Sequence, residues 1–306
     1  MKLFLSTLLV LSISLSLHAQ YEYNHEETHA IATDGLLTLD TEDADVVITG
    51  TTRSDAYVKI HKKVTGKEKR SHKFDIEYIE EGGNLTIKEK RNKTGNSYTM
   101  GWNSKTVYTV ELGLPSGVSM DISGEDDNYT ITNINGSIKI KSEDGDISLS
   151  DSSPKMLDVK LEDGDVELLT VRTDFDIKLE DGNISAENCE FGNLNLRLED
   201  GDVMLNEVSL GSTKIVTEDG NIAIAVNCDS KTQVNINSED GDIKIKTSGE
   251  GATVDVSYED GDVDYDGDDY EVLNKTKRSK KLKTKKSGQA SFKISVEDGD
   301  VRLSNM

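Results

Sequence analysis

The sequence predicts an all-β protein, a parallel β-helix or β-solenoid built from repeats of about 19 residues. Each repeat is expected to consist of a strand, an acidic turn and a second strand. Two observations support this fold class: a turn of the form Glu-Asp-Gly-Asp or Glu-Asp-Gly-Asn recurs at a nearly constant interval, and apolar residues alternate with polar residues on both sides of it. The turn glycines are Gly145, Gly164, Gly182, Gly201, Gly220, Gly241, Gly261 and Gly299; the first six intervals are 18–21 residues, and the last is 38, twice the repeat length.

The alternation within a repeat has the period of two that a β-strand requires, because successive side chains point to opposite faces. In one repeat, the residues expected to face the core are Leu157, Val159, Leu161, Val166 and Leu168. The following repeats give Phe175, Ile177, Leu179 and Ile184, and then Leu194, Leu196, Leu198, Val203 and Leu205. Each strand therefore gives one face to the interior.

A meander of antiparallel hairpins is the competing fold, because Asp-Gly between alternating runs is a strong hairpin signal. Hairpins, however, place no demand on the length of chain between successive turns. A solenoid does, since each coil must bring its strands back above those of the coil before it. The nearly constant period therefore favours the solenoid.

Residues 1–19 are predicted to be a signal peptide. Lys2 is followed by the apolar run LFLSTLLVLSISLSL and by the small residue Ala19 at the expected cleavage point. A membrane anchor is the alternative, but the run is short for a membrane span. We therefore expect an exported protein that is periplasmic, cell-surface or secreted, with Gln20 or Tyr21 at its new N-terminus.

Residues 20–123 are expected to form atypical coils that cap the solenoid, and residues 124–306 to form its regular repeats. Weaker copies of the turn occur around Ala44, Gly83 and Asp127, and the last of these lies one repeat before Gly145, in register with the regular turns. Trp102 lies near Tyr98 and Tyr108 in the irregular part of this region. These large side chains are expected to cover an open end of the solenoid; stacking on a sugar is the alternative.

The acidic turn has a structural component and a charged component. Glycine supplies the positive φ of a tight corner, and Asp or Asn after it can accept hydrogen bonds from nearby backbone N–H groups. Stacked carboxylates about 5 Å apart repel by about 0.8–0.9 kcal/mol per contact in water. The candidate binding residues are the turn aspartates Asp144, Asp146, Asp163, Asp165, Asp181, Asp200, Asp202, Asp219, Asp240, Asp242, Asp260, Asp262, Asp298 and Asp300.

Calcium is the one candidate cofactor, since hard cations bind carboxylate and carbonyl oxygens in turns. Diffuse binding of counterions and no ion role at all are the alternatives. No dedicated metal site and no other cofactor is expected from the sequence.

A basic insertion spans residues 274–287 and lies within the double-length interval before Gly299. Its basic residues are Lys275, Lys277, Arg278, Lys280, Lys281, Lys283, Lys285 and Lys286. The alternation of Lys with Thr or Leu suits an extended strand. The segment is either a solvated loop or degenerate coil, or a patch that binds anionic polymers, lipid headgroups or the acidic turns of another copy.

The overall charge argues against nucleic acid as a partner. The chain has 58 acidic and 35 basic residues, a formal net charge of -23, and phosphate binding needs a basic surface. Apolar residues make up 34% and aromatic residues 5%. That composition suits a thin, elongated core rather than one large globular core.

No enzyme is expected. HEETH, from His25 to His29, matches the zinc-protease pattern His-Glu-x-x-His, but that pattern works only on a helix. Here it precedes a strand-like segment, so a chance match in a solvated N-terminal tail is predicted. A uniform row of carboxylates also lacks the two different environments that an acid–base pair needs.

The two cysteines, Cys189 and Cys228, are separated by two repeats in the predicted stacking. Strands are spaced by about 4.8 Å, so these residues are expected near 10 Å apart, beyond the reach of a disulfide. A bond in an oxidising compartment is the alternative that the sequence leaves open.

The recurring EDGD(V/I)x(L/I), the opening GLLTLDTEDADVVITG and the segment YTVELGLPSGVSMDISG resemble the bacterial DUF4097 family of putative adhesins. The chain is also similar to the head domains of putative autotransporter adhesins. The resemblance implies a β-solenoid and an exported, adhesin-like binding module of the cell envelope or surface. Its partner would be a surface or envelope component, protein or polysaccharide. A structural envelope or matrix protein without a specific ligand is the alternative, and a polysaccharide-active β-helix enzyme is the third.

Overall fold

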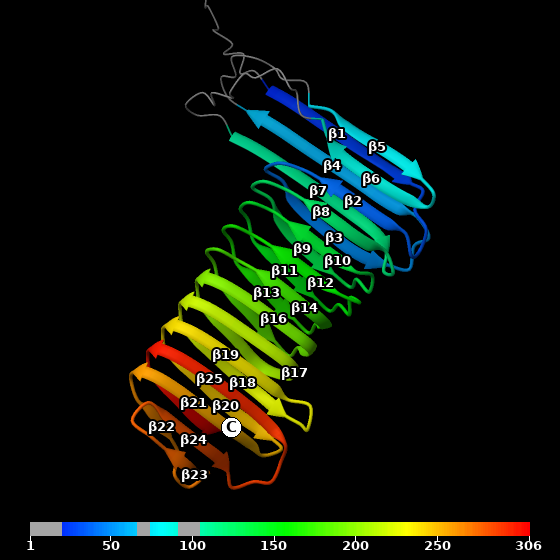
Figure 1. The fold of residues 1–306 in the computed structure, drawn as a ribbon. Coiled ribbons are helices and arrows are strands. Elements are labelled where there is room, and N and C mark those ends of the chain that lie inside the picture. The colour runs from blue at the N-terminus through cyan, green and yellow to red at the C-terminus, as the bar shows by residue number, and fades with distance from the viewer. Residues whose placement is uncertain (1–19, 66–73, 91–104) are drawn as a thin grey trace, which may run out of the picture.

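The computed structural model describes residues 20–65, 74–90 and 105–306, and these residues form 26 β-strands and no helix. The predicted signal peptide, Tyr98 and Trp102 lie outside the described residues. The coils stack into an elongated, solenoid-like body, with the N-terminal strands at one end (Figure 1). The prediction of an all-β fold is confirmed.

The strands belong to two sheets that share the long strand β17 (Val203–Asp219). Sheet A has the order β1 (Gln20–His29), β4 (Ala56–Thr65), β7 (Lys105–Pro115), β3 (Asp45–Thr51), β9 (Asn128–Thr132), β11 (Ile147–Ser150), β13 (Val166–Leu169), β15 (Ile184–Glu187), β17, β18 (Ile222–Cys228), β20 (Ile243–Gly249), β26 (Val301–Asn305) and β22 (Val263–Tyr265). Sheet B has the order β5 (Ile76–Glu81), β6 (Asn84–Glu89), β2 (Leu36–Asp40), β8 (Ser119–Ser123), β10 (Ile138–Lys141), β12 (Leu157–Lys160), β14 (Arg172–Lys178), β16 (Glu190–Asp200), β17, β19 (Gln233–Asp240), β25 (Ala290–Asp298), β21 (Ala252–Asp260), β24 (Ser279–Thr284) and β23 (Tyr270–Lys275).

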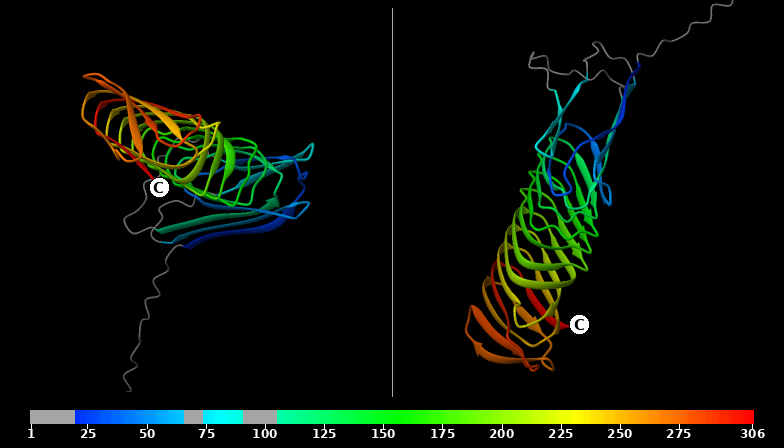
Figure 2. Two further views of the ribbon diagram at one scale, coloured as in Figure 1. Left: turned by 90° about the horizontal axis from the view of Figure 1, so that it is seen from below. Right: turned by 90° about the vertical axis from the view of Figure 1, so that its right-hand side faces the viewer.

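Each regular coil contains one strand of sheet B, the Glu-Asp-Gly corner, one strand of sheet A and a second corner. Neighbouring coils pair in parallel: Ile147 of β11 lies opposite Val166 of β13, which lies opposite Ile184 of β15. The Glu-Asp-Gly segment is therefore a corner between two sheets and not a hairpin turn. Figure 2 shows the resulting stack along and across its long axis.

The spatial order of the coils differs from the sequence order at both ends. The coil formed by β2 and β3 lies between the β6/β7 pair and the β8/β9 pair. At the other end, the last coil, β25 and β26, inserts between the β19/β20 and β21/β22 coils. The double-length interval between Gly261 and Gly299 therefore contains neither a solvated loop nor a degenerate coil, because the chain builds an end hairpin beyond β21 and then returns.

Antiparallel strands close both ends of the stack. At the N-terminal end, sheet A ends in β4 and β1, and sheet B ends in the hairpin β5–β6. At the far end, sheet B ends in the antiparallel strands β24 and β23. Gly82 and Gly83, with φ of 60° and 84°, form the turn of the β5–β6 hairpin, so the predicted corner around Gly83 is wrong. The copies around Ala44 and Asp127 are genuine corners that lie side by side.

The core is a continuous column of apolar side chains between the two sheets. Every residue predicted to face inward in the three repeats from Leu157 to Leu205 is buried, with at most 3% of its surface exposed. Cys189 and Cys228 are buried in this column and are not bonded to each other. Burial raises the pKa of Cys228 to about 11, so its thiol stays protonated at neutral pH.

Candidate functional site

The eight Glu-Asp-Gly corners form one column along the edge where sheet B passes into sheet A. We call their Glu, Asp and Asn side chains the acidic ridge. Backbone hydrogen bonds join successive corners; for example, Gly201 N–H donates to the Asp219 carbonyl at 3.0 Å. All fourteen predicted aspartates therefore lie on a single ridge, exposed except for the half-buried Asp242 and Asp300.

The residue after each turn glycine takes part in a ladder that connects the coils. Its side-chain oxygen accepts a hydrogen bond from the backbone N–H of the equivalent residue in the next coil. Asp165 Oδ1 accepts from Asn183 N–H at 2.8 Å, and Asp202 Oδ1 accepts from Asn221 N–H at 2.8 Å. In spatial order the ladder is Asn128, Asp146, Asp165, Asn183, Asp202, Asn221, Asp242, Asp300 and Asp262.

The ladder explains why Asp and Asn exchange at this position, since both offer the same acceptor oxygen. The sequence predicted a bond to a nearby N–H but not that the donor belongs to the next coil. The asparagines also separate like charges: Asn183 Nδ2 donates to Asp165 Oδ1 at 2.9 Å, and Asn221 Nδ2 donates to Asp202 Oδ1 at 3.1 Å. Part of the predicted repulsion between coils is thereby relieved.

Because the ladder oxygens already accept backbone hydrogens, we expect only a small calcium-specific effect on stability. Both sodium chloride and calcium chloride should raise the melting temperature by screening the ridge. At matched ionic strength, calcium should add less than about 1 kcal/mol, or about 2–4 °C. Thermal scans followed by circular dichroism measure this difference.

The matched variant carries Asp163→Asn and Asp200→Asn, two exposed ridge carboxylates outside the ladder. It should lose any calcium-specific increment and be at least as stable as the parent without calcium, because two repelling charges are gone. A calcium increment well above about 4 °C that this variant abolishes would instead establish ordered calcium sites.

The basic segment forms the far end of the stack rather than an insertion between coils. It contributes the end of β23 and all of β24, which pairs antiparallel with β21. Seven of the eight predicted basic residues are exposed, whereas Lys280 is 8% exposed. Lys280 Nζ donates to the Val263 carbonyl at 2.8 Å and lies 5.0 Å from the Tyr265 ring centroid, so Lys280 holds the end strand in place and does not belong to the exposed patch.

The opposite end carries a cluster of aromatic and histidine side chains between β1 and β5. The HEETH segment lies in β1, so the helical zinc-protease arrangement is excluded, and the prediction of a solvated tail is wrong. The His25 and His29 rings stack on Tyr78, with centroids 4.6 and 4.7 Å away. His29 Nδ1 lies 2.9 Å from Glu80 Oε1. Burial lowers the pKa of His25, and the charge of Glu27 opposes that shift.

Tyr108, in β7, is buried at the same end of the stack and is 2% exposed. It packs edge-on against Phe74, and Lys62 Nζ lies 4.2 Å from the Tyr108 ring centroid. Lys62 Nζ also pairs with Glu89 Oε1 at 3.3 Å. Burial raises the pKa of Glu89, although the Lys62 charge opposes the shift.

The row of His25, Glu27 and His29 was not predicted from the sequence. Its signal was present in the spacing: residues i, i+2 and i+4 share one face of a strand.

The comparisons with known proteins identify the family. The family model described as Toastrack DUF4097 matches residues 36–304, from the first residue of β2 to the penultimate residue of β26. The chain belongs to the DUF4097 family. The predicted resemblance is thus confirmed, and β1 lies before the matched residues. The comparison with curated proteins gave no match.

Solved structures share the fold of this DUF4097 chain at low sequence identity. A protein of Parabacteroides distasonis ATCC 8503 described as a putative lipid binding protein has a TM-score of 0.55 and 14% identity, covering 92% of this chain and 96% of that one. A second protein of that strain, described as a putative adhesin, has a TM-score of 0.51 and 11% identity, covering 92% and 97%. A Parabacteroides merdae ATCC 43184 protein, also described as a putative adhesin, has a TM-score of 0.50 and 12% identity, covering 92% and 95%.

Proposed function

We propose that this DUF4097 chain is an exported, non-catalytic binding module of the cell envelope or cell surface, and that it presents the acidic ridge to a positively charged partner. The observation that carries the proposal is that the ridge bears more charge than its corners need. The ladder uses only the residue after each glycine. The side chains of the ridge glutamates Glu162, Glu199 and Glu218 are exposed and make no hydrogen bond or ion pair within the described residues.

The related structures and the sequence support the assignment in different ways. Two of the related structures belong to proteins described as putative adhesins and a third to one described as a putative lipid binding protein, all consistent with a binding role. The predicted signal peptide supports export. The described part of the chain contains no helix long and apolar enough to cross a membrane. The partner would be a protein or polysaccharide of the envelope.

Two alternatives have less support. A structural envelope or matrix protein would not need unpaired glutamates on the ridge such as Glu162, Glu199 and Glu218. A polysaccharide-cleaving enzyme needs two carboxyl groups in different environments on an open surface. The described carboxyl groups whose pKa burial raises are Glu89 and Asp127, and neither lies on an open surface: the Glu89 side chain is 13% exposed and Asp127 is fully buried.

Binding of labelled protein to envelope fractions of the source organism tests the proposal. A ridge variant carries Glu162→Gln, Glu199→Gln and Glu218→Gln, which removes three charges but no ladder contact. Its binding should weaken at least about tenfold, and the binding of the parent should fall as salt rises.

The matched control carries Glu167→Gln, Glu187→Gln and Glu207→Gln, which removes the same net charge from exposed positions away from the ridge. Its binding should equal that of the parent. Equal loss in both variants would indicate a net-charge effect, and no binding by any form would favour the structural alternative.

A further inference from the structure

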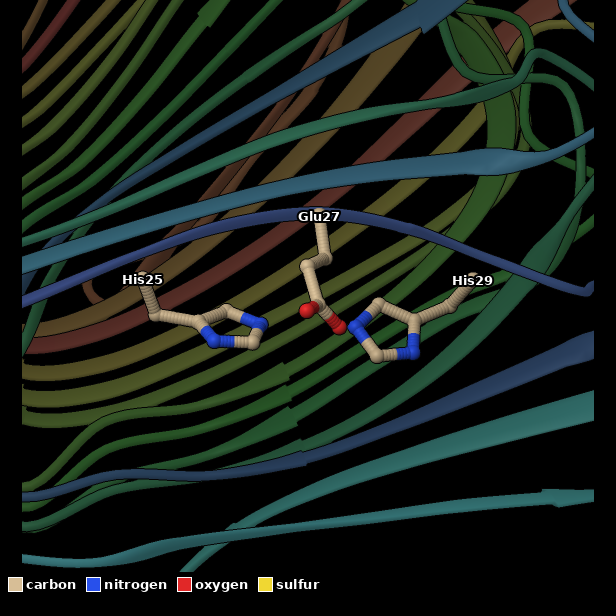
Figure 3. A group of neighbouring side chains, drawn as sticks. All are labelled: His25, Glu27 and His29. Atoms are coloured by element: carbon tan, nitrogen blue, oxygen red, sulfur yellow. The ribbon is translucent and has the colours of Figure 1, made fainter.

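The inner face of β1 places three metal-ligand side chains next to one another. His25, Glu27 and His29 alternate along the strand, so all three project toward β5. One ligand atom from each lies within 4.8 Å of the other two. Figure 3 shows the two imidazole rings leaning toward each other, with the Glu27 carboxylate between them.

The hydrogen bonding of His29 leaves one ring nitrogen available as a ligand. Nδ1 lies 2.9 Å from Glu80 Oε1, a carboxylate that can only accept, so Nδ1 carries a proton and in the neutral ring Nε2 presents its lone pair. His29 is 7% exposed, and its Nε2 is buried without a hydrogen-bond partner. Buried polar atoms are rarely left unpaired in native proteins. Carboxylate–histidine pairs of this kind orient imidazole ligands in many metal sites.

The imidazole ring of His25, like that of His29, has a nitrogen that lacks a partner. Its Nε2 is also buried without a hydrogen-bond partner, while its ring is fixed by stacking on Tyr78. Two imidazole nitrogens with no partner therefore face one region of space, and Glu27 is the exposed carboxylate beside them. A cation that accepts nitrogen and oxygen ligands would satisfy all three groups at once.

We propose that the inner face of β1 binds one transition-metal ion of the zinc type, with His25, Glu27 and His29 as its protein ligands and Glu80 as the residue that orients His29. Two imidazoles and a carboxylate suit Zn²⁺, Ni²⁺ or Cu²⁺, whereas Ca²⁺ and Mg²⁺ require mainly oxygen ligands. Metal–ligand bonds of about 2.0–2.2 Å require the three atoms to come closer than they lie in the unliganded side chains. The exposed Glu27 side chain can move toward the ion, and the two imidazole rings must turn toward it as well.

The site differs from the acidic ridge in position, chemistry and origin. The ridge offers oxygen ligands and lies on a corner, whereas this site lies between the terminal strands of the two sheets. It is also carried by β1, which precedes the residues matched by the family model. Since Glu80 belongs to β5, a bound ion would connect the end strand of sheet A to that of sheet B through His29.

The test measures zinc binding to the tag-free, metal-free full chain by competition with a chromophoric chelator. Excess calcium chloride and sodium chloride are included so that the ridge carboxylates are occupied or screened. The parent should bind one equivalent of zinc more tightly than any remaining equivalents. His25→Ala and Glu27→Gln should each weaken that equivalent at least about tenfold, because each removes one of three ligands, and Glu80→Gln should weaken it by about 10–100-fold.

The matched control is His61→Ala. His61 lies on neighbouring β4, where its Nδ1 is 2.7 Å from Asn24 Oδ1, and it is not one of the three proposed ligands. Its zinc affinity should equal that of the parent. Cobalt provides a second readout, since a site with imidazole ligands should give visible d–d absorption that His25→Ala abolishes.

Because His29→Ala could disturb the end of the stack, the decision rests on the exposed Glu27→Gln variant and on the cobalt spectrum. Zinc affinity unchanged in both Glu27→Gln and His25→Ala would assign the bound metal to the ridge and overturn the proposal. Zinc binding to the parent that is no tighter than calcium binding would overturn it as well.

Discussion

Gly201→Val is expected to lower the free energy of unfolding by about 2–6 kcal/mol. Gly201 has a φ of 142°, a conformation that costs a β-branched residue about 1–3 kcal/mol. A Cβ atom there would also lie 2.8 Å from the carbonyl carbon of Gly182 and closer still to its oxygen. Overpacking of this kind costs about 1–3 kcal/mol more. Urea denaturation followed by circular dichroism measures the loss.

Asp202→Asn is the matched control for the corner, one residue away. Its side-chain oxygen should still accept the Asn221 N–H, so its stability should stay within about 0.5 kcal/mol of the parent. Equal losses from Gly201→Val and Asp202→Asn would show that the charge of the corner, rather than its backbone packing, determines stability.

The regular coils could be predicted from the sequence because one local pattern recurs there. The alternation of apolar and polar residues predicted which side chains face the core, and the constant period predicted the number of residues in each coil. Positive φ at the turn glycines was also predictable. The close packing of the corners was not predictable: every turn glycine after Gly145 lies against the carbonyl of the turn glycine in the neighbouring coil, and Gly145 lies against that of Asp127. These contacts join residues that are distant in sequence.

The ends could not be predicted, because their arrangement depends on pairing between distant segments. The inserted last coil requires Asp242 Oδ1 to accept from Asp300 N–H, and Gly299 to lie against Gly241. Nothing in the sequence of the last repeat shows that its coil stacks between two earlier coils rather than beyond the coil that contains Gly261. The same applies to the coil formed by β2 and β3.

The candidate site was predicted in part. The acidic turns do form one ridge, but the burial of Lys280 follows from its place in an antiparallel end strand, which the basic run alone does not reveal. The histidine cluster depends on β5, whose Tyr78 and Glu80 are far from β1 in sequence. Local spacing within β1 could indicate a shared face but not these partners.

Asp127→Ala is expected to destabilise the protein by about 3–5 kcal/mol, because it removes a buried acceptor of three hydrogen bonds. Asp127 occupies the position of a turn glycine, but its side chain is fully buried. Its carboxylate accepts from Ala44 N–H at 2.5 Å, from the Thr41 hydroxyl at 3.0 Å and from the Tyr129 hydroxyl at 3.1 Å. It thus ties the early coil of β2 and β3 to the coil of β8 and β9.

Asp127→Asn is the informative control, since its carbonyl oxygen can accept the Ala44 N–H while its amide donates to the two hydroxyl groups. We expect a loss of only about 1 kcal/mol at neutral pH. Burial raises the pKa of Asp127 in the folded state above its value in the unfolded state. The contribution of this shift to the free energy of unfolding is therefore fully present below the unfolded-state pKa and is lost as pH rises through the folded-state pKa. The stability advantage of the parent over Asp127→Asn, measured by urea denaturation across this range, should therefore be larger in acid and shrink toward neutral pH. An advantage that grows with pH would mean that Asp127 is stabilised as a carboxylate, and that the three donors outweigh its burial.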